Sequence, residues 1–242
     1  MPPGKDSSSF PSTHWTFVRA VQGGSADESA QAMEQLCKRY WYPIYAFLRR
    51  SGHNPQDAED QTQAFFERLI SDEVMQSARQ GEGKLRSFLL GVLKRHLSRT
   101  HTHDSAQKRG GGVVHVSFDE MEAEERYACE PQETRDPEWH FNHAWAKELM
   151  DGVLKKLREV LAASGRDKMF DTLLPYLMWD TEPPSHKDIA QQLGITEAGA
   201  SVLIFRLRRS FRDLLHKEVA TTVLNRHEIP GELEWLQSVL VK

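Results

Sequence analysis

Three histidines and one aspartate lie close together in the sequence and have side chains that could hold a metal ion: His96, His101, His103 and Asp104. Imidazole nitrogens and a carboxylate are donors that Zn²⁺ takes in hydrolases, where the metal activates a water molecule. The segment HTHDS lacks the second histidine of the HxHxDH phosphoesterase pattern, and the polar end of a helix explains these residues more simply. A metal-dependent hydrolase is therefore the weakest alternative.

The sequence carries no other signature of catalysis. It has no Gly-rich phosphate loop, no nucleophile elbow and no kinase motif. We therefore expect no catalytic residue, no metal and no cofactor, and we expect that the protein is not an enzyme.

The overall composition predicts a soluble cytoplasmic protein. Cys37 and Cys129 are the two cysteines and lie far apart, so a disulfide framework is not expected. The opening MPPGKDSSSF lacks the apolar core of a signal peptide, and no stretch approaches the roughly 20 apolar residues that span a bilayer. The net charge of -4 over 242 residues conceals strong segregation of charge along the chain.

An acidic helix and then a basic helix are predicted in the first half of the chain. In HNPQDAEDQTQAFFERLI, Asn54 is a suitable N-cap and Pro55 a suitable first residue of a helix. Carboxylates lie on its outer face, which could be ordinary helix solvation. In KLRSFLLGVLKRHLSR, leucines face inward and cations surround them. An acidic and a basic helix in one small domain suggest two partners of opposite charge.

Residues 188–219 predict a helix, a tight turn and a longer helix. Gly194 can take the positive φ of the turn, and Thr196 can cap the second helix. This is the pattern of a helix-turn-helix, and an ordinary helical hairpin with a solvated basic face is the alternative.

The second of these helices has the composition of a DNA-recognition helix. Val202, Phe205 and Leu207 are expected to pack inward in part. The cations that follow suit a helix docked in a major groove near phosphates. They are Arg206, Arg208, Arg209 and Arg212.

Together these patterns predict an all-α fold of two small helical domains joined by a flexible acidic linker, with the helix-turn-helix in the second domain. The linker shows no sustained helical period. It could shield a basic surface, occupy a basic channel in a partner, or simply be solvated. The predicted division is a disordered N-terminus at 1–12, a first domain at 13–104, the linker at 105–135, a second domain at 136–222 and a helical tail at 223–242.

Two of these stretches resemble an extracytoplasmic-function sigma factor of bacterial RNA polymerase. PQDAEDQTQAFFERL resembles the Asp-Ala-Glu-Asp helix of the family, and DIAQQLGITEAGASVLIFRLRR resembles its minus 35 reader. The resemblance covers roughly Trp15 to Arg99 as the family's region two and Glu138 to Val219 as its region four.

The resemblance implies that the chain binds core RNA polymerase and gives it promoter specificity. In the family, the acidic helix docks on the β′ clamp helices, the basic helix engages the minus 10 element, and region four meets the β flap and minus 35 DNA. The positions that match the polymerase-binding surface are Asp57, Glu59, Asp60, Gln63 and Glu67. The minus 10 positions are Lys84, Arg86, Lys94, Arg95 and Arg99. The minus 35 positions are Thr196, Ser201, Arg206, Arg208, Arg209 and Arg212.

The chain also departs from the common pattern of that family. Ser201 and Leu203 stand where members often carry a basic residue, so phosphate anchoring is expected at minus 35 ahead of base reading. The linker and tail resemble those of a longer-linker subgroup. An anti-sigma factor or another regulator is a further expected partner. The tail could also replace such a regulator, a hypothesis tested by deleting residues 232–242.

The alternative function is a stand-alone helix-turn-helix regulator that binds operator DNA as a dimer. That alternative explains residues 188–219 but leaves the acidic helix without a role.

Overall fold

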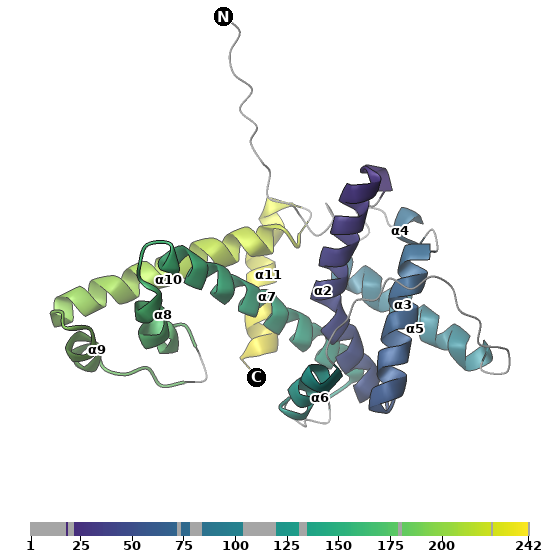
Figure 1. Ribbon diagram of the computed structural model, residues 1–242, viewed down its shortest axis with the longest axis horizontal. Helices are drawn as coiled ribbons and strands as arrows, with labels where there is room; N and C mark the ends of the chain where they lie inside the picture. Colours follow the sequence, from purple (N-terminus) through teal and green to yellow (C-terminus); the bar gives the residue numbers. More distant parts are fainter. Residues whose placement is uncertain are drawn as a thin grey trace, which may run out of the picture.

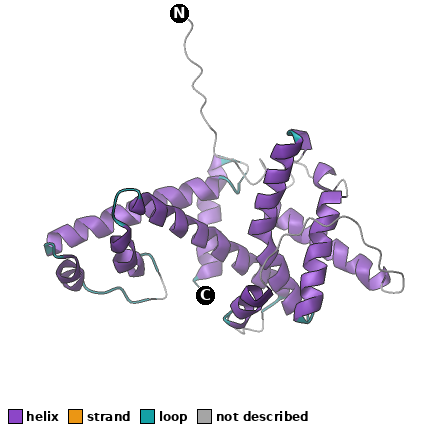
Figure 2. Ribbon diagram, in the orientation of Figure 1, coloured by secondary structure: helices purple, strands orange, loops and turns teal. Residues whose placement is uncertain are grey.

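The computed structural model describes residue 18 and residues 22–71, 74–77, 84–103, 120–130, 135–178, 181–223 and 225–241. Every regular element in these ranges is a helix and none is a strand (Figures 1 and 2), which confirms the all-α class. None of the helices described there has the length and hydropathy needed to cross a bilayer. The predicted disordered residues 1–12 lie outside the described ranges.

The helices follow one another in this order: α2 (Ala26–Arg50), α3 (Pro55–Ser71), α4 (Val74–Ser77), α5 (Leu85–His103), α6 (Glu120–Ala128), α7 (Pro137–Ala162), α8 (Asp167–Leu173), the 3₁₀ turn η1 (Leu174–Tyr176), α9 (His186–Leu193), α10 (Glu197–Ala220), the 3₁₀ turn η2 (Arg226–Glu228) and α11 (Ile229–Leu240).

The helix boundaries follow the capping residues that the sequence predicts. The Asn54 side chain accepts a hydrogen bond from the backbone N–H of Asp57 at 2.8 Å, and α3 begins at Pro55. Thr196 Oγ1 accepts from the backbone N–H of Gly199 at 3.1 Å at the start of α10. Gly194 ends α9 with φ of +65°, a conformation that residues with a side chain rarely adopt.

The first of two apolar cores lies where α7 packs against α2, with α3 and α5 on the other side of α2 (Figure 1). Tyr40 and Trp41 of α2 are buried there with Phe65 of α3 and with Phe141 and Trp145 of α7. The first half of α7, which the sequence assigns to the second domain, therefore shares a core with residues of the first.

The second core is built on the other end of α7. Leu157 of α7 packs there with Phe170 of α8, Ile189 of α9, and Ile204 and Leu207 of α10. The 26 residues of α7 thus contribute to both cores, and one continuous helix connects the two ends of the molecule (Figure 1).

Part of the predicted linker is helical, which corrects the expectation of a segment without helical period. In α6, Glu124 accepts from Arg49 Nη2 at 2.8 Å and from the Tyr45 hydroxyl at 2.5 Å. The hydrogen bond from Arg49 lowers the pKa of Glu124. Besides these polar contacts with α2, Ala123 is buried and Tyr127 packs against the first core. Two such residues four positions apart are too few to show a sustained helical period in the sequence. Linker residues 105–119 and 131–134 lie outside the described ranges.

His96 should make the stability of the first core depend on pH. It is buried in α5 and its ring meets Phe65 edge to face at 6.1 Å between centroids. Burial, with a smaller effect of the Arg68 charge, lowers its pKa from 6.5. Below pH 6.5 the unfolded chain takes up a proton on this histidine, whereas burial disfavours the protonated form in the folded chain. The free energy of unfolding should therefore decrease as the pH is lowered, by up to about 1.4 kcal/mol per pH unit. Urea unfolding between about pH 7.5 and 5.5 measures this slope.

His96→Leu should flatten that slope, because it removes the titrating group. Replacement of the exposed His216 by Leu is the control and should leave the slope as in the parent. Equal slopes for the parent and His96→Leu would contradict the assignment.

Candidate nucleic-acid and protein interfaces

The predicted polymerase-binding residues lie along α3. Glu59, Asp60, Gln63 and Glu67 recur at spacings that place them on one side of the helix. Asp60 is exposed and the other three are half-buried. Asp57 is exposed in the first turn, where its carboxylate accepts a hydrogen bond from Asn54 Nδ2 at 2.7 Å. The structure thus presents a carboxylate-rich face on α3.

A cavity of about 260 Å³ opens beside this face, between α2 and α3. Trp41 and Tyr45 form one wall, with their rings stacked at 5.2 Å between centroids, and Pro55 and Glu59 line the other. The sequence analysis missed the two aromatic residues, although their spacing of four places them on one side of α2. Both rings are almost fully buried, with Trp41 2% and Tyr45 3% exposed, so they form the inner wall of the cavity and Glu59 supplies the acidic group at its rim.

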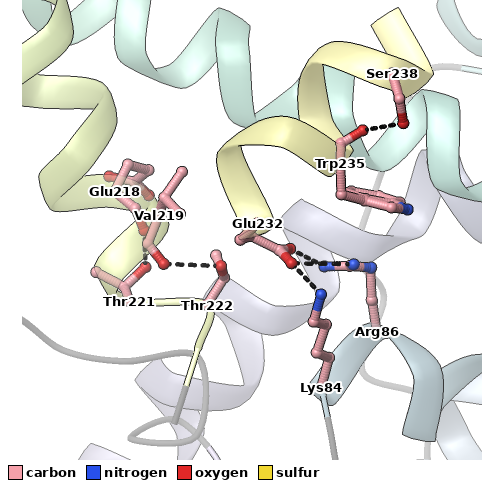
Figure 3. A network of polar contacts seen from close by, with 9 residues as sticks. All are labelled: Lys84, Arg86, Glu218, Val219, Thr221, Thr222, Glu232, Trp235 and Ser238. Carbon is pink, nitrogen blue, oxygen red and sulfur yellow. Dashed lines mark hydrogen bonds and ion pairs between the residues drawn. The ribbon is translucent and has the colours of Figure 1, made fainter. Parts of the chain in front are cut away.

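The predicted minus 10 cations do not form one open surface. Lys84 and Arg86 both pair with Glu232 of α11, as Figure 3 shows. Arg86 is 5% exposed and Glu232 is 1% exposed. The Arg86 guanidinium also lies 3.6 Å from the ring centre of Trp235 (Figure 3). Arg86, expected to contact DNA, is instead buried in this conformation, because α11 supplies the anion that the sequence pattern could not reveal.

The other predicted minus 10 cations lie further along α5. Lys94 pairs with Glu138 at the surface, and Arg95 is exposed. The side chain of Arg99 lies outside the described residues. No group of three possible metal ligands occurs in the described part of the chain, and Asp104 and the side chains of His101 and His103 fall outside it.

The predicted minus 35 residues divide between the outer face of α10 and contacts within the protein. Thr196 is the N-cap of α10, and Ser201 Oγ lies 2.9 Å from His186 Nδ1. Arg208 Nε donates to the Tyr176 carbonyl at 3.2 Å. The remaining three arginines are exposed and make no ion pair with any described residue: Arg206, Arg209 and Arg212.

Two apolar residues of α10 point outward, against the sequence-based expectation. Val202 is 48% exposed and Phe205 is 67% exposed, whereas Leu207 is buried as predicted. The core-facing side of α10 is set by Ala200 and Ile204, and the helical repeat places Val202 and Phe205 roughly opposite them.

The fold defines an all-α protein with a carboxylate-rich face on α3 and a basic face on α10. No protein-family model matches the chain, and no curated protein or solved structure matches it.

Replacement of Glu232 by Ala should destabilise the fold strongly. The change leaves the buried Arg86 without its anion, and breaking a buried ion pair in this way typically removes about 3–5 kcal/mol from the free energy of unfolding. Chemical denaturation measures the loss. Glu234→Ala, at an exposed position of the same helix, should change stability by less than about 0.5 kcal/mol. Similar losses in the two variants would contradict a stabilising role for the buried pair.

Proposed function

We propose that this chain is a sigma-type initiation factor, a non-enzymatic cytoplasmic protein that binds core RNA polymerase and directs it to promoters. The observation that carries the proposal is that two exposed faces of opposite charge lie on different parts of one all-α chain. Figure 1 shows α3 on one side of the molecule, whereas α10 runs toward the opposite end and carries the exposed arginines near its middle. A regulator that binds only DNA needs the second face and leaves the first unexplained.

In this proposal, the acidic face of α3 docks on the β′ clamp helices of the polymerase. Its carboxylates supply charge complementarity, which favours correct orientation and fast association. The motif resemblance of PQDAEDQTQAFFERL supports this assignment.

At the other end, α10 engages duplex DNA at minus 35. Arg206, Arg209 and Arg212 make no ion pair with any described residue and are exposed, so they can contact phosphates. The resemblance of residues 188–219 to a minus 35 reader and the α9–turn–α10 geometry support this assignment.

The minus 10 contact requires a rearrangement if it uses Lys84 and Arg86. Both cations pair with Glu232, so α11 must release them before they reach DNA. Glu232→Gln keeps the shape of the side chain and removes the charge that holds them. This variant should bind a single-stranded oligonucleotide more tightly than the parent, because two more cations can meet phosphates.

Fluorescence anisotropy with a single-stranded probe measures that change, and Glu234→Gln on the exposed side of α11 is its control. Affinity of Glu232→Gln equal to that of the parent would instead make Lys84 and Arg86 purely structural and leave minus 10 contacts to Lys94 and Arg95.

Binding to core RNA polymerase tests the proposal itself. The purified chain should co-elute with the core enzyme in gel filtration. A variant with Asp57, Glu59 and Asp60 replaced by Ala should lose most of that binding, because it removes three charges from the docking face.

The matched control replaces three carboxylates elsewhere, Glu34, Glu159 and Asp171, which are exposed on α2, α7 and α8. This control should bind like the parent. A parent chain that fails to bind core enzyme but binds duplex DNA tightly would favour the stand-alone regulator.

A further inference from the structure

The solvent-facing side of α10 is apolar near the start of the helix and basic further along it. Ala198, Val202 and Phe205 recur at spacings of four and three, so they form one apolar stripe. All three are exposed. Arg209 and Arg212 continue the same side of the helix, and Arg206 flanks it. We call the first three residues the apolar stripe.

Core packing does not explain this stripe. The inward side of α10 is already filled by Ala200, Ile204 and Leu207, each of which is buried. A single exposed apolar residue is ordinary, but three in a row along one side of a helix leave a contiguous apolar surface in water. The stripe also lies on the part of α10 that reaches the end of the molecule (Figure 1), where no other described helix covers its outer side.

The arginines beside the stripe indicate which partner it meets. Three cations that make no ion pair with any described carboxylate favour a polyanion. They lie on the same side of α10 as the stripe, so one partner surface must accept both the cations and the apolar residues. A DNA duplex offers this combination, because its phosphates border a major groove that admits an α-helix. The thymine C5-methyl is the apolar group that projects into that groove.

We propose that Val202 and Phe205 read thymine methyl groups in the major groove, while Arg206, Arg209 and Arg212 hold the bordering phosphates. This inference rests on the proposed function and names the base recognised at the same site. Residues three apart on a helix are separated by about 4.5 Å along its axis, close to the roughly 3.4 Å between neighbouring bases of one strand. Val202 and Phe205 therefore contact thymines at adjacent or nearly adjacent base pairs.

Deoxyuridine substitution tests the methyl contact directly, because uracil differs from thymine only by that methyl group. Duplexes would be selected from a random-sequence library by the full-length chain, alone and with core RNA polymerase. Each thymine in the selected site would then be replaced by uracil in synthetic duplexes. At the thymines that meet Val202 and Phe205, the loss should be about fourfold per methyl group.

Variants assign each methyl group to its side chain. Phe205→Ala should weaken binding to the thymine duplex and become insensitive to uracil at one position, and Val202→Ala should do the same at a neighbouring position. Both side chains are exposed, so these variants should fold like the parent, which thermal unfolding checks. Val160→Ala, at an exposed apolar position of α7, is the matched control and should keep the full thymine preference. Arg209→Gln should weaken thymine and uracil duplexes equally and lower the salt slope by about one.

The possible failures are distinguishable. Selection of a specific site whose affinity is unchanged by uracil would overturn the methyl contact and leave DNA binding intact. Retained thymine preference in both alanine variants would also overturn it. Failure to retain any duplex, with or without core enzyme, would overturn the proposed function and this inference with it. A stripe that instead binds protein would give duplex binding unaffected by Phe205→Ala, which likewise contradicts the proposal.

Discussion

The packing of α7 against α2 determines where the charged surfaces of this protein lie. Phe141 and Trp145 of α7 are buried against α2, and the Phe141 ring lies 6.5 Å from that of Tyr40. Burial of large aromatic side chains is among the strongest apolar contributions to folding. Because α7 is one continuous helix, its other end carries α8, α9 and the first half of α10 at a defined position relative to α3 and α5. The acidic face of α3 and the basic face of α10 are thereby held apart on one body.

A buried carboxylate fixes the far end of α10 to the same body. Glu218 accepts hydrogen bonds from Arg39 of α2, at 2.6 Å, and from Lys156 of α7. Burial alone would raise the pKa of Glu218, but the hydrogen bonds from Lys156 and Arg39 outweigh it and lower the pKa. The carboxylate thus stays charged at neutral pH and ties three helices together. The exposed arginines lie near the middle of α10 and this anchor lies in its last turn, so the outer face of α10 is oriented by contacts with both α2 and α7.

The sequence predicted the local structure better than the long-range contacts. The caps of α3 and α10 and the glycine that ends α9 could be recognised because each depends on a few neighbouring residues. Sequence could not reveal that Glu232 would meet Arg86, because 146 positions separate the two residues and no local pattern marks the pair. It also missed α6, which is held in place by the polar contacts of Glu124 and by the packing of Ala123 and Tyr127. The prediction that Phe205 packs inward was wrong, because phenylalanine is usually found in the core. A residue with a role in binding can be kept at the surface against that tendency.

Promoter-dependent transcription with purified components tests the central claim most directly. Core RNA polymerase would be incubated with genomic DNA fragments in the presence and absence of the chain, and the 5′ ends of the transcripts would be sequenced. A sigma-type factor predicts new start sites that require the chain and share two upstream elements at a constant spacing. Absence of any chain-dependent start site, with a core enzyme that another sigma factor activates, would contradict the account.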